Sequence, residues 1–202
     1  MLVVIGEILF DIFPEYRRLG GAPFNLACHM HHFGWPVKFL TRVGRDKDGE
    51  EIMHILKDAG FDLNDVQIDE RKPTGRVMVE LDSSGIPGFE IIQDSAYDYM
   101  EYTREMNDLP SDKIELIYFG TLMQRSERAR KTIQGIISSR NPNTRCLYDV
   151  NLRPGCYTAS IIEASLEQAN IVKLNDHELS EIRDMPGNNP SGSGFIPWLM
   201  QK

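Results

Sequence analysis

Short apolar runs recur along this chain, and each ends in glycine or polar residues. The runs cover 2–5, 37–43, 114–119, 146–150 and 171–174. Runs of this length, rich in β-branched residues, are typical of strands that are buried on both faces of a parallel sheet. The segments with helical spacing that lie between them cover 23–33, 52–59 and 126–139. This alternation predicts an α/β fold around a central, mainly parallel sheet.

Length and charge limit the kind of protein this is. The chain has 202 residues, of which 41% are hydrophobic, and can bury the core of one globular domain. A formal net charge of -8 without a long basic run argues against a nucleic-acid partner. The apolar start at 1–5 is too short for a signal peptide or a membrane span. Because Cys28, Cys146 and Cys156 are scattered and odd in number, we expect free thiols and a cytoplasmic protein with no membrane partner.

A glycine pair precedes the first predicted helix. Gly20 and Gly21 are followed by Pro23 and Asn25. Two adjacent glycines can adopt positive φ and approach a bound molecule closely, and proline suits the first helical position. Asn25 would then lie near the positive end of the helix, where its amide can bind a polyol. The alternative is an ordinary strand-to-helix turn in which Asn25 caps the helix.

The run Gly-Gly-Ala-Pro-Phe-Asn at 20–25 resembles the N-terminal signature of the PfkB carbohydrate kinases, also called the ribokinase family, and of its fructokinase-like members in particular. Gly34 and Gly44 fall where that signature has glycines. The resemblance implies a ribokinase-like three-layer sandwich with a small β lid. It also implies transfer of the γ-phosphoryl group of ATP to a sugar hydroxyl, with Mg²⁺ as the metal. Gly20, Gly21 and Asn25 would then contact the sugar.

Asp11 lies just beyond the first predicted strand. Ligands of open α/β sheets bind outside the carboxyl ends of the strands, where a carboxylate can accept hydrogen bonds from sugar hydroxyls. The resemblance implies this role for Asp11, since an aspartate follows the first strand in the family. The alternative is a solvated loop aspartate.

The period of the pattern changes to two after Thr74. Apolar and polar residues alternate over 77–82, a turn is predicted at 82–85, and a second run covers 89–92. This predicts a β-hairpin over about 72–93, inserted in a single domain that covers 1–202. The resemblance identifies the hairpin as a lid that excludes water from the sugar and through which two copies form a homodimer. The alternative is an edge hairpin packed on its own domain.

Three polar residues alternate after the strand predicted over 146–150: Asp149, Asn151 and Arg153. Arginine suits a phosphate or a hydroxyl-rich substrate because its donors form a fork. The run resembles the family's Asp-x-Asn-x-Arg motif, which assigns Arg153 to the substrate and Asn151 to phosphate. The alternative is a salt bridge between Asp149 and Arg153 at the end of the strand.

A third polar group, formed by Lys173, Asn175 and Glu178, follows the last predicted strand. Lysine can neutralise phosphate, asparagine can cap a helix whose N-terminus attracts anions, and glutamate can order Mg²⁺ through its waters. The group resembles the family's Lys-x-Asn-x-x-Glu motif, which assigns Lys173 and Asn175 to phosphates and Glu178 to the metal. Asn175 and Glu178 also form a capping-box pattern, so a structural role is the alternative.

The family's Gly-Ala-Gly-Asp motif, which supplies the catalytic base and an anion hole, has no match in the sequence. Gly192-Ser193-Gly194 is followed by Phe195 and not by aspartate, and lies at the end of a loop predicted over 186–194. We therefore expect a chain that lacks the family's C-terminal third, has no catalytic aspartate and is inactive, because phosphoryl transfer depends on positioned charge. The alternatives are a non-catalytic sugar-binding or regulatory fragment, and a nucleoside or sugar-acid kinase of the same fold.

Overall fold

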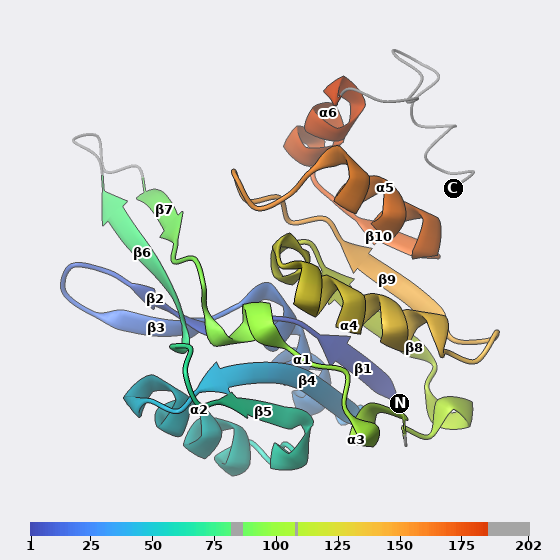
Figure 1. Ribbon diagram of the computed structural model, residues 1–202, viewed down its shortest axis with the longest axis horizontal. Coiled ribbons are helices and arrows are strands. Elements are labelled where there is room, and N and C mark those ends of the chain that lie inside the picture. Colours follow the sequence, from blue (N-terminus) through green and yellow to red (C-terminus); the bar gives the residue numbers. More distant parts are fainter. Residues whose placement is uncertain (82–86, 108, 186–202) are drawn as a thin grey trace.

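The computed structural model describes residues 1–81, 87–107 and 109–185 of the chain (Figure 1). Its centre is a six-stranded sheet in the order β10-β9-β8-β1-β4-β5, and every neighbouring pair is parallel. The strands are β1 (Leu2–Ile5), β4 (Val37–Gly44), β5 (Val66–Asp69), β8 (Leu116–Gly120), β9 (Arg145–Asp149) and β10 (Ile171–Lys173). The predicted α/β fold with a mainly parallel sheet is confirmed.

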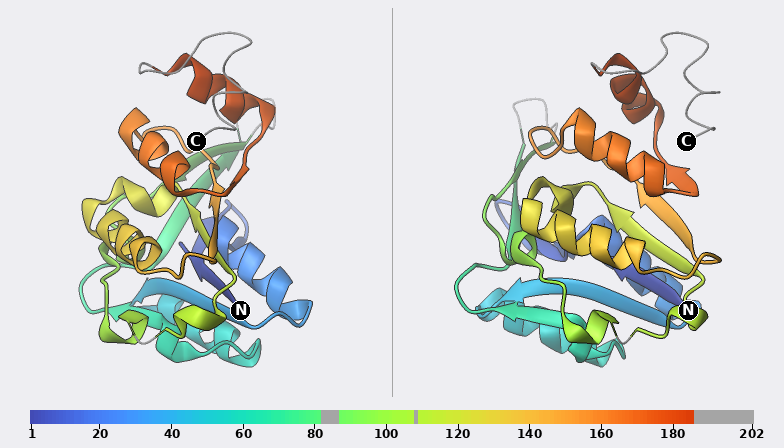
Figure 2. Two further views of the ribbon diagram at one scale, coloured as in Figure 1. Left: turned by 90° about the vertical axis from the view of Figure 1, so that its right-hand side faces the viewer. Right: turned by 45° about the vertical axis from the view of Figure 1, so that its right-hand side comes forward.

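Helices cover both faces of this sheet, which makes three layers. Alternate residues of β1 enter two separate cores: Leu2 and Val4 pack with α1 (Ala22–His32) and α2 (Lys47–Asp58). Val3 and Ile5 pack with α4 (Glu127–Ser138) and α5 (Ala159–Gln168). Figure 2 shows α1 and α4 on opposite sides of the sheet. The last described helix, α6 (Asp176–Asp184), follows β10.

A second sheet of four strands stands beside the first, in the order β3-β2-β6-β7. Its strands are β2 (Leu9–Ile12), β3 (Arg17–Gly20), β6 (Gly75–Leu81) and β7 (Pro87–Ile91). The predicted hairpin is present as β6 and β7, which pair antiparallel. The alternative of a solvated loop aspartate is wrong for Asp11: it lies on β2, which pairs in parallel with β6 from a distant part of the sequence.

Two aspartates at the start of α2 hold the base of the second sheet. Asp46 accepts hydrogen bonds from the backbone N of Thr74 at 2.8 Å and from its Oγ1 at 2.7 Å, where the chain enters β6. Asp48 is buried and accepts from Nε of Arg76 on β6 at 2.7 Å and from Arg17 on β3. Two strands of the second sheet are therefore tied to one helix of the main body.

Some elements differ from the sequence expectations. The strand β5 and the helix α5 were not predicted from the sequence pattern. The predicted turn at 82–85, the predicted loop at 186–194 and the segment that follows it lie outside the described residues. All three cysteines are free. Within the described ranges, no helix has both the length and the apolar character needed to cross a bilayer.

Candidate functional site

The candidate site lies where the parallel strands end. Because β1, β8, β9 and β10 all run in one direction, the residues that follow them gather at one edge of the central sheet. In Figure 1, β6 and β7 of the second sheet project from the body on the side where the carboxyl end of β4 lies. The space beside these strand ends is bordered by residues of the second sheet and by residues that follow β1 and β9.

A cavity of about 310 Å³ occupies this space. Five of the predicted site residues line it: Asp11, Gly21, Asn25, Asn151 and Arg153. They come from β2, from the start of α1 and from the segment after β9. The fold thus brings Asp11, Gly21 and Asn25 from the N-terminal part of the sequence to the same cavity as Asn151 and Arg153.

The glycine pair is required by close packing at this place. Gly21 has a φ of 111°, and a Cβ there would lie 2.5 Å from the carbonyl oxygen of Glu7. A Cβ on Gly20 would lie 2.6 Å from Oδ2 of Asp11, so the missing side chain leaves room for that carboxylate. Gly21 itself is the N-cap of α1. Asn25 is therefore not the cap, and it is exposed on the wall of the cavity.

Burial and nearby positive charges shift the pKa of Asp11 in opposite directions. Partial burial raises the pKa of its carboxyl, while the guanidinium groups of Arg18 and Arg153 act to lower that pKa. Nη2 of Arg18, on β3, lies 4.0 Å from Oδ2 of Asp11. Arg18 also lines the cavity and was not predicted as a site residue. No motif marks it, and only the antiparallel register of β2 and β3 places it opposite Asp11.

Glu7 is a second residue of the cavity that the sequence reasoning did not assign. It directly follows Gly6, the first residue after β1, and only 4% of it is exposed. Loss of water around the carboxyl raises its pKa to about 7, while a backbone hydrogen bond to the carboxylate and the charge of Arg153 act to lower that pKa. A signal was present in the sequence, because a carboxylate directly after a central buried strand lies at the ligand edge of the sheet.

The second polar group, which comprises Asp149, Asn151 and Arg153, is organised around Asp149. Its Oδ2 accepts a hydrogen bond from Oη of Tyr118 at 2.7 Å, and its Oδ1 accepts one from Nζ of Lys173 at 2.9 Å. The ion pair of Asp149 is therefore made with Lys173, and not with Arg153 as the alternative supposed. Arg153 is exposed, and its Nη1 donates to the carbonyl oxygen of Leu152 at 3.2 Å.

The third polar group is joined to the second by hydrogen bonds. The backbone N of Val150 donates to the carbonyl oxygen of Lys173 at 3.0 Å, and the backbone N of Leu152 donates to Oε1 of Glu178 at 3.2 Å. Asn175 caps α6, and Glu178 completes a capping box with it. The contacts of Asn175 and Glu178 thus show the structural role, which was the alternative. Their predicted roles in binding phosphate and the metal stay predictions.

Direct metal binding finds little support in these contacts. Oε2 of Glu178 accepts from the backbone N of Asn175 at 2.8 Å, so both carboxylate oxygens already have backbone donors. In the part of the chain that the structure describes, no three His, Cys, Asp or Glu residues are grouped to hold a metal ion. The predicted contact of Glu178 with Mg²⁺ through water stays a prediction.

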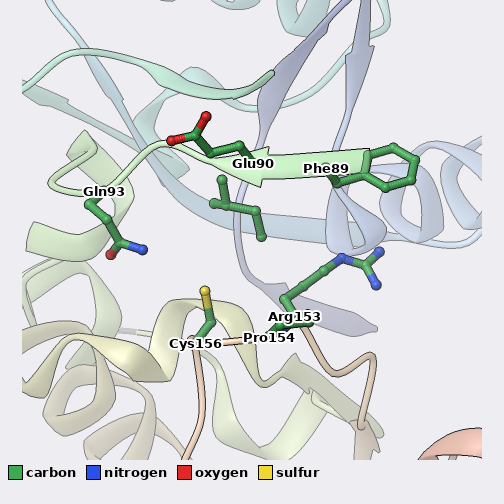
Figure 3. A pocket seen from close by; sticks show the side chains of 7 residues that line it. Phe89, Glu90, Gln93, Arg153, Pro154 and Cys156 are labelled. Carbon is green, nitrogen blue, oxygen red and sulfur yellow. The ribbon is translucent and has the colours of Figure 1, made fainter. Parts of the chain in front are cut away.

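A second cavity of about 490 Å³ adjoins the first (Figure 3). Figure 3 shows β7 on one side of it and the segment with Arg153, Pro154 and Cys156 on the other. Phe89, Ile91 and Arg153 line both cavities. The alternation of apolar and polar residues predicted β7 as a strand, but it did not predict which face of β7 lines the cavity. That face depends on the pairing register, which places Phe89 beside Val79.

The sequence matches a known family of proteins. The sequence profile described as pfkB family carbohydrate kinase matches residues 15–193. The chain is 27% identical over 199 residues to the putative sugar kinase PH1459 of Pyrococcus horikoshii, covering 89% of this chain and 63% of the relative. It is 24% identical over 200 residues to probable fructokinase-5 of Arabidopsis thaliana, covering 89% of this chain and 61% of the relative.

Solved structures give the same fold. PH1459 of Pyrococcus horikoshii in complex with ATP superposes with a TM-score of 0.79 at 26% identity, covering 91% of this chain and 66% of that one. The fructokinase of Xylella fastidiosa with bound ATP superposes with a TM-score of 0.85 at 19% identity, covering 99% of this chain and 65% of that one. The chain spans less than two thirds of the length of the two curated relatives named above. From the matched profile and the ribokinase-like architecture together, we conclude that this chain belongs to the pfkB family of carbohydrate kinases.

Proposed function

We propose that this chain carries the sugar-binding half of an ATP-dependent sugar kinase of the fructokinase type. The observation that carries the proposal is a single cavity lined by the carboxylate of Asp11, the amide of Asn25 and the guanidinium of Arg153. Such a set offers both donors and acceptors to a polyol, and the volume of about 310 Å³ lies in the range of ligand pockets. The fructokinases among the relatives support this substrate class.

Each residue has a distinct role in this proposal. Asp11 accepts hydrogen bonds from sugar hydroxyls, and Asn25 both donates and accepts. Gly20 and Gly21 let the backbone approach the sugar. Arg153 lies on the shared wall of the two cavities and would meet the substrate or the transferred phosphoryl group. These groups bind and orient the sugar, and the removal of its hydroxyl proton is assigned to none of them.

The nucleotide would bind along the second and third polar groups. Lys173 is 63% exposed and, with Asn151 and Asn175, would neutralise and orient phosphate oxygens. The ATP complex of PH1459 supports ATP as the phosphoryl donor. Mg²⁺, bound with the nucleotide, would supply charge neutralisation between the phosphates. Glu178 would meet the metal through water, which is the role predicted for it, while its oxygens keep their backbone hydrogen bonds.

We expect sugar binding without turnover by this chain alone. Phosphoryl transfer needs a base for the hydroxyl proton and donors that stabilise the charge on the phosphoryl group, and neither is assigned to a residue of this chain. The chain would then act as a sugar-binding or regulatory unit. A sugar-acid kinase is the second candidate, because Arg18 and Arg153 both line the cavity and could pair with a substrate carboxylate.

Calorimetry and a turnover assay test these proposals together. We expect the purified chain to bind fructose and to form no ADP above background with fructose, ATP and Mg²⁺. Tighter binding of gluconate than of fructose would favour the sugar-acid candidate. ADP formation that Lys173→Met abolishes would show an active kinase and contradict the expected inactivity. Failure to bind fructose, gluconate or a nucleoside would contradict the proposed site itself.

A homodimer through the second sheet is also proposed. On β6, the exposed Met78 alternates with the buried Val77 and Val79, so it lies on the face that points away from the cavity. Tyr16, between β2 and β3, is 59% exposed. Two such faces would cover each other in a symmetric pair. Sedimentation equilibrium is expected to show a dimer that Met78→Glu weakens, and a wild-type monomer at all concentrations would contradict it.

A further inference from the structure

We infer that Glu7 is a further sugar-binding residue of the cavity, and that its carboxylate accepts a hydrogen bond from a hydroxyl of the substrate. The inference rests on the proposed function. Glu7 follows the central strand β1 and lines the same cavity as Asp11 and Asn25. Its position at the ligand edge of the sheet comes from the backbone path, since the carbonyl oxygen of Glu7 is packed against Gly21 at the start of α1.

A carboxyl group in this place is costly unless something binds it. Glu7 is only 4% exposed, and burying a charged carboxylate is unfavourable even though a backbone N–H and nearby guanidinium groups favour its charged form. A ligand hydroxyl would supply a donor inside the cavity. The charged form of Glu7, which lines the cavity, would therefore be stabilised further when a polyol is bound.

The surroundings of Glu7 decide its charge near neutral pH. Burial raises its pKa to about 7. A hydrogen bond from the backbone N–H of Glu7 and two cationic groups, Arg153 after β9 and Arg125 before α4, act to lower this pKa, whereas Asp149 on β9 raises it. Two phenols, Tyr97 and Tyr118, also act on or are acted on by its charge, and Asp11 and Arg18 line the same cavity. The balance leaves Glu7 divided between its neutral and charged forms near pH 7.

The direction of the pH effect follows from linkage. A hydroxyl that donates to the carboxylate stabilises the charged form, so the pKa of Glu7 is lower in the complex than in the free chain. Binding then releases a proton when the free carboxyl is protonated. Affinity is therefore full above the free pKa of about 7 and falls as the pH drops below it.

Calorimetric titration with fructose between about pH 6 and about pH 8 tests the inference. Wild-type affinity is expected to rise about tenfold across this range, with proton release seen as a dependence of the heat on the buffer. Glu7→Gln, which mimics the neutral form, should bind at all pH values about as weakly as the wild type does at the low end. Glu163→Gln, an exposed glutamate of α5, should behave as the wild type.

Carbon-13 NMR of the glutamate carboxyl carbons in the wild type gives a test that needs no variant. The resonance that Glu7→Asp removes should titrate near pH 7 in the free chain and at lower pH with fructose. Fructose binding whose pH dependence is flat, or is unchanged in Glu7→Gln, would overturn this inference and leave the proposed function intact. No fructose binding at any pH would overturn both.

Discussion

Replacement of Asp11 by asparagine is expected to weaken fructose binding by about 10- to 100-fold. Its carboxylate lines the cavity and lies between Arg18 and Arg153, so it can accept charge-assisted hydrogen bonds from two hydroxyls. Each such bond is worth about 1.5–3 kcal/mol, and an amide of the same shape loses the charge and one acceptor. Calorimetry at about pH 8, where Glu7 is charged, measures the loss.

The matched control for this change is Asp58→Asn. Asp58 is exposed at the last position of α2, on the main body and outside the residues that line the cavity. It should bind fructose as the wild type does, and both variants should unfold at the same urea concentration as the wild type within error. Asp11→Asn with an affinity within about twofold of wild type would contradict the role of Asp11 in holding the sugar.

Replacement of Arg125 by methionine is expected to lower the free energy of unfolding by about 3–5 kcal/mol. Nε and Nη2 of Arg125 each lie 2.8 Å from an oxygen of Asp98, and both side chains are 7% exposed. Nη2 also donates to Oη of Tyr97 and to the carbonyl oxygen of Ile92, both at 3.0 Å. Removal of the guanidinium leaves a buried carboxylate without its cation. Urea denaturation measures the change.

Two further variants separate this effect from loss of any surface charge. Arg128→Met removes an arginine that is 56% exposed and paired with Glu101, and should cost about 1 kcal/mol or less. The double replacement of Arg125 by methionine and Asp98 by leucine should recover part of the loss, because no unpaired charge stays buried. Equal effects of Arg125→Met and Arg128→Met would contradict the account of this pair.

The central sheet could be predicted because its signals are local. The runs at 2–5 and 37–43 became β1 and β4 almost without change of boundary, since apolar residues predominate in strands at the centre of a parallel sheet. The strands β2 and β3 could not be predicted in this way. Leu9–Ile12 is a strand because it pairs with β6, and that partner lies in a distant part of the sequence.

Only part of the candidate site could likewise be predicted from local sequence signals. Gly21, Asn25 and Arg153 belong to motifs at strand ends, and the rule that parallel strands end at one edge brings them to the same cavity. Arg18 and Glu7 belong to no motif. Arg18 reaches the cavity through the register of β2 and β3. The position of Glu7 after the first buried strand was a signal in the sequence, but the extent of its burial is known only from the fold.

The central claim is that polar groups far apart in the sequence form one sugar site between the two sheets. A crystal structure of this chain with bound fructose tests it most directly. The account predicts a fructose molecule in the cavity of about 310 Å³, hydrogen-bonded to Asp11 and Asn25 and within reach of Arg153. Fructose bound elsewhere on the chain, with that cavity holding only water, would contradict it.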